Sequence, residues 1–137
     1  HTFRGPTTRN RIMFMDAGHL YVYLSYGIHH CVNVVTGREG RGEAVLIRAL
    51  EIVDGVDAAR ARRVGRPDRE LANGPGKLGA ALGIDLGHDS VDALAHDSPL
   101  RLLDDGTPPP ADPLVGPRIG ITVGVDTPWR FRVPPPR

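Results

Sequence analysis

The sequence contains a single cysteine, Cys31, and this scarcity excludes an internal disulfide. A lone thiol is typical of a protein from a reducing compartment. The chain also lacks a hydrophobic run long enough for a membrane-spanning helix, and residues 1–15 lack the apolar stretch of a signal peptide. These absences predict a soluble cytoplasmic protein.

Lysine is nearly absent as well, because Lys77 is the only one and all other basic residues are arginine. A guanidinium binds phosphate through a two-pronged hydrogen-bonded fork, although a GC-rich genome produces the same bias. The net charge is +1, but residues 81–117 hold many aspartates against Arg101 alone, so positive charge gathers in the rest of the chain. This segregation fits either a polyanionic partner or ordinary solvated surfaces.

The length and the hydrophobic periodicity predict a small α+β protein. A chain of 137 residues buries one modest core, which predicts a single domain over residues 1–137. Alternating apolar residues predict strands over residues 19–25, 28–35, 43–52, 117–125 and 128–133. The third of these strands is expected to be largely buried. A brief further strand is expected at residues 100–103. Short helices are predicted from a cap at Asp54 to about Val64, with solvent-facing arginines, and over residues 73–83.

Aromatic residues make up only 5% of the chain, yet all three tyrosines fall within six residues. On a strand, Tyr21 and Tyr23 share one face, and Leu20, Val22 and Leu24 share the other. The two rings therefore either pack in a sheet or look into a cleft. Tyr26 precedes Gly27 at the tip of the predicted hairpin, where core packing gives no reason for a ring. A rigid ring on a narrow hairpin suits insertion between stacked bases, and a neighbouring ring suits stacking on a displaced base.

Polar residues interrupt the apolar strands at two positions. Arg48 lies within an apolar run, so its guanidinium either forms a salt bridge, for example to Glu51, or lies at the floor of a pocket. Asn33 alternates into a second apolar strand and is expected to present its amide to the same cleft. Adjacent strand residues point to opposite faces, so His29, His30 and Cys31 do not form a metal site.

Sequence motifs along nearly the whole chain resemble those of the alkyladenine (3-methyladenine) DNA glycosylase family. They run in the family's order: "R-x-x-T-x-R-N-R-x-M-F-M" before residue 16, "G-x-L-Y-V-Y-x-x-Y-G" at 18–27, "VLIRALE" at 45–51, "NGPGKL" at 73–78, "PRIG" at 117–120 and "PWRF" at 128–131. The resemblance implies a curved, mainly antiparallel β-sheet with a protruding β-hairpin and short helices, similar to the C-terminal domain of a tRNA-recognising formyltransferase.

The resemblance also implies roles for individual residues. Tyr26 would be the wedge that enters the minor groove, and Tyr23 and His1 would sandwich the flipped base. Asn33 would crowd the exocyclic amino group that guanine has and adenine lacks. Arg48 would hold the attacking water, assisted by a backbone carbonyl near Ile119. Contacts with the DNA backbone are expected from four further residues, Arg9, Arg11, Gly76 and Lys77, whereas Tyr21 is expected to be structural.

The implied function is that of a monofunctional DNA glycosylase of base excision repair, which hydrolyses the N-glycosidic bond of alkylated purines after base flipping. No metal or organic cofactor is implied. The implied partner is double-stranded DNA. The protein is expected to bind it as a monomer and to be associated with the nucleoid of a bacterial cell. The family's catalytic glutamate precedes the histidine matched by His1, so we expect an N-terminally truncated chain without the general base. Two alternatives are a catalytically inactive DNA-binding module and an RNA-binding domain of similar fold.

Overall fold

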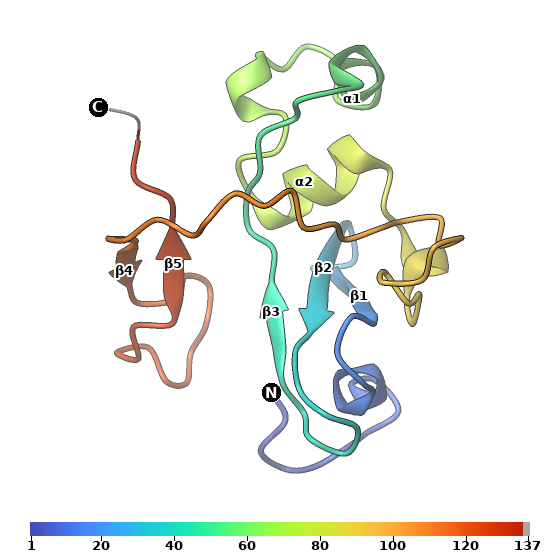
Figure 1. Ribbon diagram of the computed structural model, residues 1–137, viewed down its shortest axis with the longest axis vertical. Helices are drawn as coiled ribbons and strands as arrows, with labels where there is room; N and C mark the ends of the chain where they lie inside the picture. Colours follow the sequence, from blue (N-terminus) through green and yellow to red (C-terminus); the bar gives the residue numbers. More distant parts are fainter. Residues whose placement is uncertain (136–137) are drawn as a thin grey trace. The chain divides into compact units, whose positions relative to one another are not determined.

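A computed structural model describes residues 1–135 (Figure 1). The residues group into two compact units, His1–Leu103 and Asp104–Arg137, and each is described by itself. Small antiparallel sheets and two short α-helices confirm the predicted α+β class. The prediction of a single domain stays a prediction. Within the described residues, no helix is long and apolar enough to cross a membrane.

The first unit contains a three-stranded sheet in the order β1-β2-β3. Strands β1 (Leu20–Ser25) and β2 (His29–Val35) form the predicted hairpin. Their antiparallel register places Tyr21 opposite Asn33 and Tyr23 opposite Cys31. Because side chains alternate along a strand, these four residues share one face of the ribbon.

The third strand is shorter and more exposed than predicted. β3 spans only Ala44–Leu46, paired with β2 so that Asn33 lies opposite Leu46. The prediction of a largely buried strand over residues 43–52 was wrong, since none of these residues is buried and Val45 is 53% exposed. The reason is topological: β3 is an edge strand with a neighbour on one side only.

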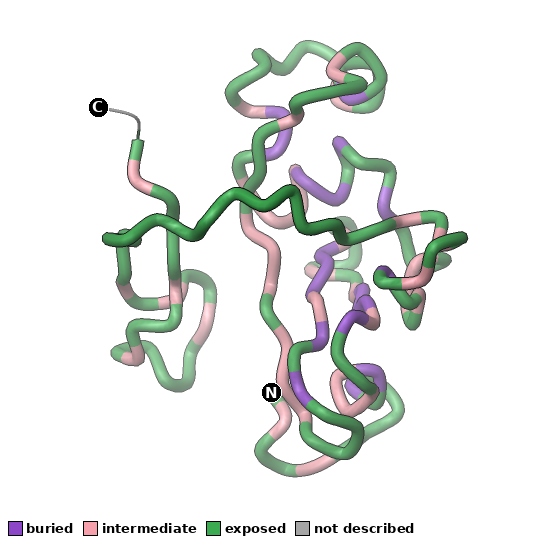
Figure 2. The backbone as a smooth tube through the Cα atoms, in the orientation of Figure 1, coloured by how far each residue is buried: buried purple, intermediate pink, exposed green. Residues whose placement is uncertain are grey.

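The opposite face of the ribbon packs against helix α2 (Pro75–Leu82), and α2 in turn packs against helix α1 (Val56–Arg62). The buried residues of this core come from β1, β2, both helices and the segments that flank them (purple in Figure 2): Leu20, Val22, Val32, Ala59, Leu71, Ala72, Leu78, Ala81, Ile84 and Ala93. Helix α2 begins after Gly74 and ends at Gly83, whose φ is +70°, as the sequence predicts.

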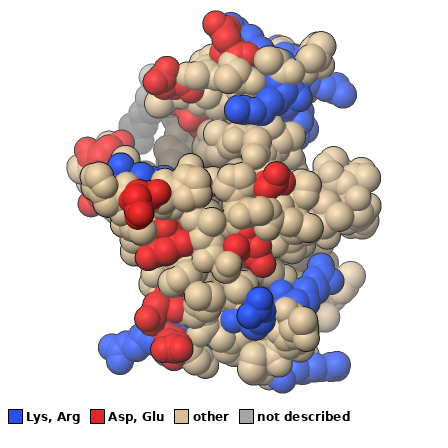
Figure 3. Space-filling view, turned by 90° about the vertical axis from the view of Figure 1, so that its right-hand side faces the viewer, with Lys and Arg blue, Asp and Glu red and all other residues tan. Residues whose placement is uncertain are grey.

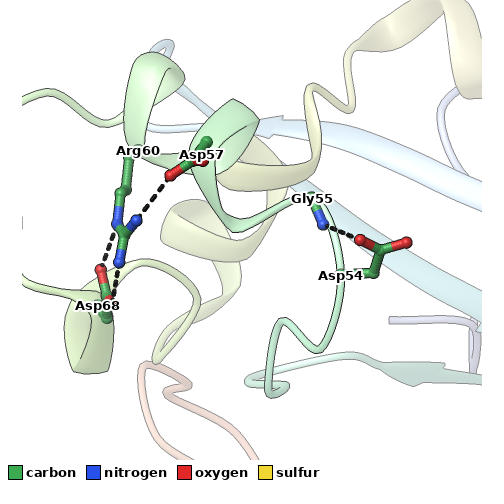
Figure 4. A network of polar contacts seen from close by, with 5 residues as sticks. All are labelled: Asp54, Gly55, Asp57, Arg60 and Asp68. Atoms are coloured by element: carbon green, nitrogen blue, oxygen red, sulfur yellow. Dashed lines mark hydrogen bonds and ion pairs between the residues drawn. The ribbon is translucent and has the colours of Figure 1, made fainter.

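The predicted cap of α1 was wrong. The N-cap residue is Gly55, with a φ of +68°, and no side chain caps the helix. The carboxylate of Asp54 instead accepts a hydrogen bond from the N–H of Gly55, its direct neighbour (2.7 Å, Figure 4). Asp54 therefore stabilises the turn before the helix rather than the free N–H groups of its first turn.

Arginines of α1 tie the helix to its surroundings. Arg60 bridges Asp57 and Asp68, each at 2.6 Å, and thereby joins α1 to the 3₁₀ helix η2 (Asp68–Glu70; Figure 4). These hydrogen bonds raise the pKa of the Arg60 guanidinium and lower the pKa of Asp68. Arg62 donates to the Ala81 carbonyl of α2 (3.0 Å). Arg60 and Arg62 are exposed as predicted, but both serve contacts within the chain.

Two further 3₁₀ helices complete the first unit: η1 (Arg11–Phe14), which follows the N-terminal loop, and η3 (Leu86–His88), which follows α2. The strand expected at residues 100–103 does not form. Within residues 1–135, the backbone of this segment makes one hydrogen bond to another segment: the N–H of Leu102 donates to the Ala93 carbonyl (2.8 Å).

The second unit contains a two-stranded antiparallel sheet, β4 (Leu114–Gly116) with β5 (Arg130–Arg132). β5 falls inside the predicted segment 128–133. The strand predicted over residues 117–125 was wrong, because β4 precedes it. Left-handed glycines, Gly120 at φ +75° and Gly124 at φ +67°, break this segment into turns.

Candidate nucleic-acid interface

Tyr26 occupies the exposed tip of the β1–β2 hairpin. Its side chain is 89% exposed, so it does not pack in the core. The N–H of Ile28 donates to the carbonyl of Ser25 (3.1 Å), and the two enclosed residues both have positive φ, +52° for Tyr26 and +69° for Gly27. Two positive φ values are the signature of a type I′ turn, in which asparagine or glycine is the usual first residue. A tyrosine here costs conformational energy, and strain of this kind clusters at functional sites.

Behind the tip, two tyrosine rings stack on the face of the ribbon away from the helices. The centroids of Tyr21 and Tyr23 are 5.6 Å apart with an angle of 28° between the rings. Tyr21 is buried, as expected for a structural residue, whereas Tyr23 is half-buried. The guanidinium of Arg9 lies over the Tyr23 ring, 5.8 Å from its centroid. The face therefore offers one partly accessible aromatic surface beside a positive charge.

Cys31 is a member of this face that the sequence analysis did not assign to the site. Burial raises the pKa of the Cys31 thiol, and a hydrogen bond with Tyr23 and the charge of Arg48 oppose that rise. Burial also raises the pKa of the Tyr23 phenol, which stays neutral at physiological pH. The contact between Tyr23 and Cys31 could have been predicted from the hairpin register, which places residues 23 and 31 opposite each other.

Arg48 is half-buried beyond the end of β3 and close enough to influence Cys31. Among the described residues 1–135, no carboxylate forms an ion pair with it. The alternative of a salt bridge, for example to Glu51, is therefore not observed within these residues. The other alternative, a guanidinium at the floor of a pocket, stays a prediction. Asn33 is buried beside this segment, and its Nδ2 donates to the Tyr21 carbonyl (3.2 Å).

The loop that carries His1 and Arg9 is organised by the buried side chain of Asn10. Asn10 Oδ1 accepts from the N–H of Thr7 (2.6 Å), and its Nδ2 donates to the carbonyls of His1 (3.0 Å) and Gly5 (3.3 Å). The His1 side chain is exposed. Sequence reasoning missed Asn10, because a loop asparagine gives no sign of which carbonyls it will bind.

The start of α2 lies against the return strand of the hairpin. A Cβ atom at Gly76 would lie 2.8 Å from the Cβ of His29, so only glycine fits without displacing the histidine. Lys77 Nζ donates to Asn73 Oδ1 (2.9 Å). Gly76 and Lys77 thus neighbour the hairpin that carries Tyr26.

The two remaining predicted site residues are both exposed. Arg11 is exposed on η1, and Ile119 belongs to the second unit, where it is 55% exposed. Over residues 1–135, no group of three or more His, Cys, Asp or Glu side chains is placed to hold a metal ion.

An exposed aromatic tip, a ring-lined face and a basic loop are together typical of a nucleic-acid-binding domain. The chain matches the methylpurine-DNA glycosylase family over residues 1–136, and it belongs to that family.

Relatives from several organisms agree with this assignment. The chain is 50% identical over 135 residues to a protein of Burkholderia lata, 50% identical over 136 residues to one of Nocardia farcinica, and 51% identical over 134 residues to one of Methanoculleus marisnigri. By name, all three are 3-methyladenine DNA glycosylases. These alignments cover 98%, 98% and 96% of this chain but only 65%, 64% and 69% of the relatives. The chain thus spans about two thirds of the length of these proteins.

Proposed function

We propose that this chain forms the DNA-binding and base-recognition part of a monofunctional DNA glycosylase that acts on alkylated purines of the 3-methyladenine type in base excision repair. The observation that carries the proposal is the Tyr26 ring, 89% exposed on a strained hairpin tip. Membership of the family and the half-buried Tyr23 behind the tip support it.

The proposed first step is base flipping. Tyr26 enters duplex DNA from the minor groove and fills the space that the target nucleotide leaves. Extrusion of a base costs a few kcal/mol, and less for a damaged base, which favours lesions. The flipped base lies between the rings of Tyr23 and His1. An alkylated purine carries positive charge, so it is attracted to the face of a neutral tyrosine ring.

Specificity and hydrolysis use the polar residues of the same face. Asn33 crowds the exocyclic amino group of guanine, which adenine lacks. Arg48 holds the attacking water, assisted by a backbone carbonyl near Ile119. The water oxygen bonds to the anomeric carbon of the sugar as the bond to the base nitrogen breaks, and the electron pair leaves with the cationic base. The attacking water also releases a proton, which a general base other than the residues named here, or the surrounding solvent, takes up.

The wider setting of the proposal follows from the same family membership. Arg9, Arg11, Gly76 and Lys77 contact the phosphate backbone, and the protein acts as a monomer in the bacterial cytoplasm, associated with the nucleoid. The two units belong to one domain whose antiparallel sheet is curved, as in the formyltransferase C-terminal domain. Small antiparallel sheets and a β-hairpin are compatible with that architecture.

The deciding experiment measures release of free base from methylated duplex DNA by the gene product. We expect release of alkylated purines by the wild type and its loss in Tyr26→Ala. Val53→Ala is the matched control, because Val53 is also strongly exposed (87%) and belongs to no proposed site.

The alternatives predict different results. Binding of methylated duplex without release would favour an inactive DNA-binding module. RNA binding, together with a DNA affinity that Tyr26→Ala leaves unchanged, would favour an RNA-binding domain.

A further inference from the structure

A second exposed aromatic residue stands on a tight turn of the N-terminal loop. The N–H of Gly5 donates to the carbonyl of Thr2 (2.9 Å), which makes Phe3 and Arg4 the two central residues of a β-turn. Phe3 is 83% exposed, nearly as much as Tyr26. The guanidinium carbon of Arg4 lies 5.3 Å from the centroid of the Phe3 ring. The turn therefore presents a ring and a cation side by side to solvent.

The turn is anchored on both sides. Asn10 Nδ2 donates to the carbonyls of His1 (3.0 Å) and Gly5 (3.3 Å), which flank the turn. Thr2 Oγ1 donates to the Gly42 carbonyl (2.7 Å), and a Cβ at Gly42 would lie only 2.7 Å from that of Thr2. Because the backbone is fixed before and after Phe3, the exposure of the ring does not result from a frayed end.

The loop that carries the turn is basic. Residues 1–15 contain Arg4, Arg9 and Arg11 and no acidic residue. On the face drawn in Figure 3, arginine and lysine side chains gather in separate groups with acidic side chains between them, and one group lies at the lower end, where Figure 1 places the N-terminal loop and η1. The positive charge is therefore local. The N-terminal loop contributes to it, and the same loop places the guanidinium of Arg9 over the ring of Tyr23.

The geometry of the pair suits a sugar–phosphate backbone. When a guanidinium lies over a ring, its N–H donors, which lie in its plane, remain free at its edge for a two-pronged bond to phosphate. The phenyl ring has no polar atom, and the apolar surface beside a phosphate in DNA is the deoxyribose. An exposed phenyl ring gains no free energy from burial of its apolar surface. Contact with the deoxyribose would remove part of that surface from water and so favour binding.

We propose that the Phe3–Arg4 turn is a second DNA contact, in which Arg4 binds a backbone phosphate and Phe3 packs on the adjacent deoxyribose. The proposal rests on the proposed function, since it requires duplex DNA as the partner. It assigns the turn a task separate from base flipping: it holds the duplex while Tyr26 displaces the nucleotide.

The test is the affinity of the 137-residue chain for a fluorescent duplex with a tetrahydrofuran abasic site, measured by anisotropy over a series of salt concentrations. Arg4→Ala is expected to weaken binding and to reduce the slope of log affinity against log salt by about 0.9, the contribution of one phosphate contact. Phe3→Ala is expected to weaken binding about fivefold at every salt concentration without changing the slope, because an apolar contact releases no counterion.

Two exposed residues outside the proposed interface provide matched controls, Arg66→Ala for the charge and Val53→Ala for the apolar side chain. Thermal melting of all four variants is expected to match the wild type, since each changed side chain is exposed. If Phe3→Ala and Arg4→Ala bind like their controls while the wild type binds the duplex and the gene product releases alkylated base, the proposal for the turn fails and the proposed function stands. If the wild type does not bind the duplex, both fail.

Discussion

At the scale of single residues, the most informative feature is the backbone conformation of Tyr26. A φ of +52° is uncommon for any residue other than glycine, and rarer still for one with a bulky side chain. Asparagine is enriched several-fold at such positions. The fold therefore contains a residue that the turn itself does not favour, and this points to selection for the ring.

The first prediction at this scale concerns Tyr26→Asn. We expect the free energy of unfolding to rise by about 1 kcal/mol, because asparagine tolerates the left-handed conformation. Base flipping should be lost, measured as the absence of 2-aminopurine fluorescence enhancement beside a lesion. Urea denaturation measures the gain in stability.

Ser90→Asn is the control for this prediction. Ser90 is the other residue besides glycine with a positive φ (+67°) among the described residues, and it is exposed. The same gain in stability is expected, with flipping unchanged. A loss of stability in Tyr26→Asn would show that the tyrosine ring itself supports the hairpin.

At the scale of elements, glycines of α2 allow the hairpin to pack closely against the helix. A Cβ atom at Gly79 would lie 2.1 Å from the carbonyl oxygen of His30, far inside contact distance, and the nearest atom is rigid backbone. At Gly76, the neighbour is the His29 side chain. The return strand of the hairpin and the helix thus approach each other as closely as their backbones permit.

Gly79→Ala is therefore expected to lower the free energy of unfolding by about 2 to 3 kcal/mol, the upper part of the range typical of overpacking, because the neighbouring atom is rigid backbone. The strand must also move away from the helix, so the amide resonances of His29 and His30 should shift in NMR spectra. Gly74→Ala, at the N-cap position of the same helix, is the matched glycine control. Its Cβ would meet Lys77 at an ordinary 3.6 Å, and its φ of −169° suits any residue. Equal losses for both variants would refute the close-contact argument.

Among the elements, the sequence predicted α2 well and β3 poorly, for different reasons. Gly74-Pro75 and Gly83 impose local backbone preferences that begin and end a helix wherever they occur. The length of β3 depends instead on how far a partner strand follows it. An apolar run such as residues 45–50 has the same composition at the centre of a sheet and at its edge, so its burial was predicted incorrectly.

At the scale of the whole molecule, the two units differ in how much they bury. The first has a core of ten buried residues from the sheet and both helices. In the second, none of residues 104–135 is buried, and Trp129 and Phe131 are 66% and 65% exposed. A unit of this length without a core, disulfide or metal is not expected to fold by itself.

Two fragments test this difference. Residues 1–103 are expected to unfold cooperatively on heating, whereas residues 104–137 are expected to give the circular dichroism and narrow amide dispersion of an unfolded chain. A folded second fragment would contradict the argument and would also count against a single domain over residues 1–137.

The sequence by itself determined the family, the hairpin with its two faces, the ends of α2 and the exposed ring at position 26. Each of these follows from motifs, from alternation along a strand or from the φ preferences of glycine and proline, which act between neighbours in the chain. The tertiary structure decided that Arg48 has no carboxylate partner within residues 1–135, that Asn10 anchors the loop of His1, and that Phe3 and Arg4 face solvent together. These facts depend on which distant groups meet in space, and no local pattern records that.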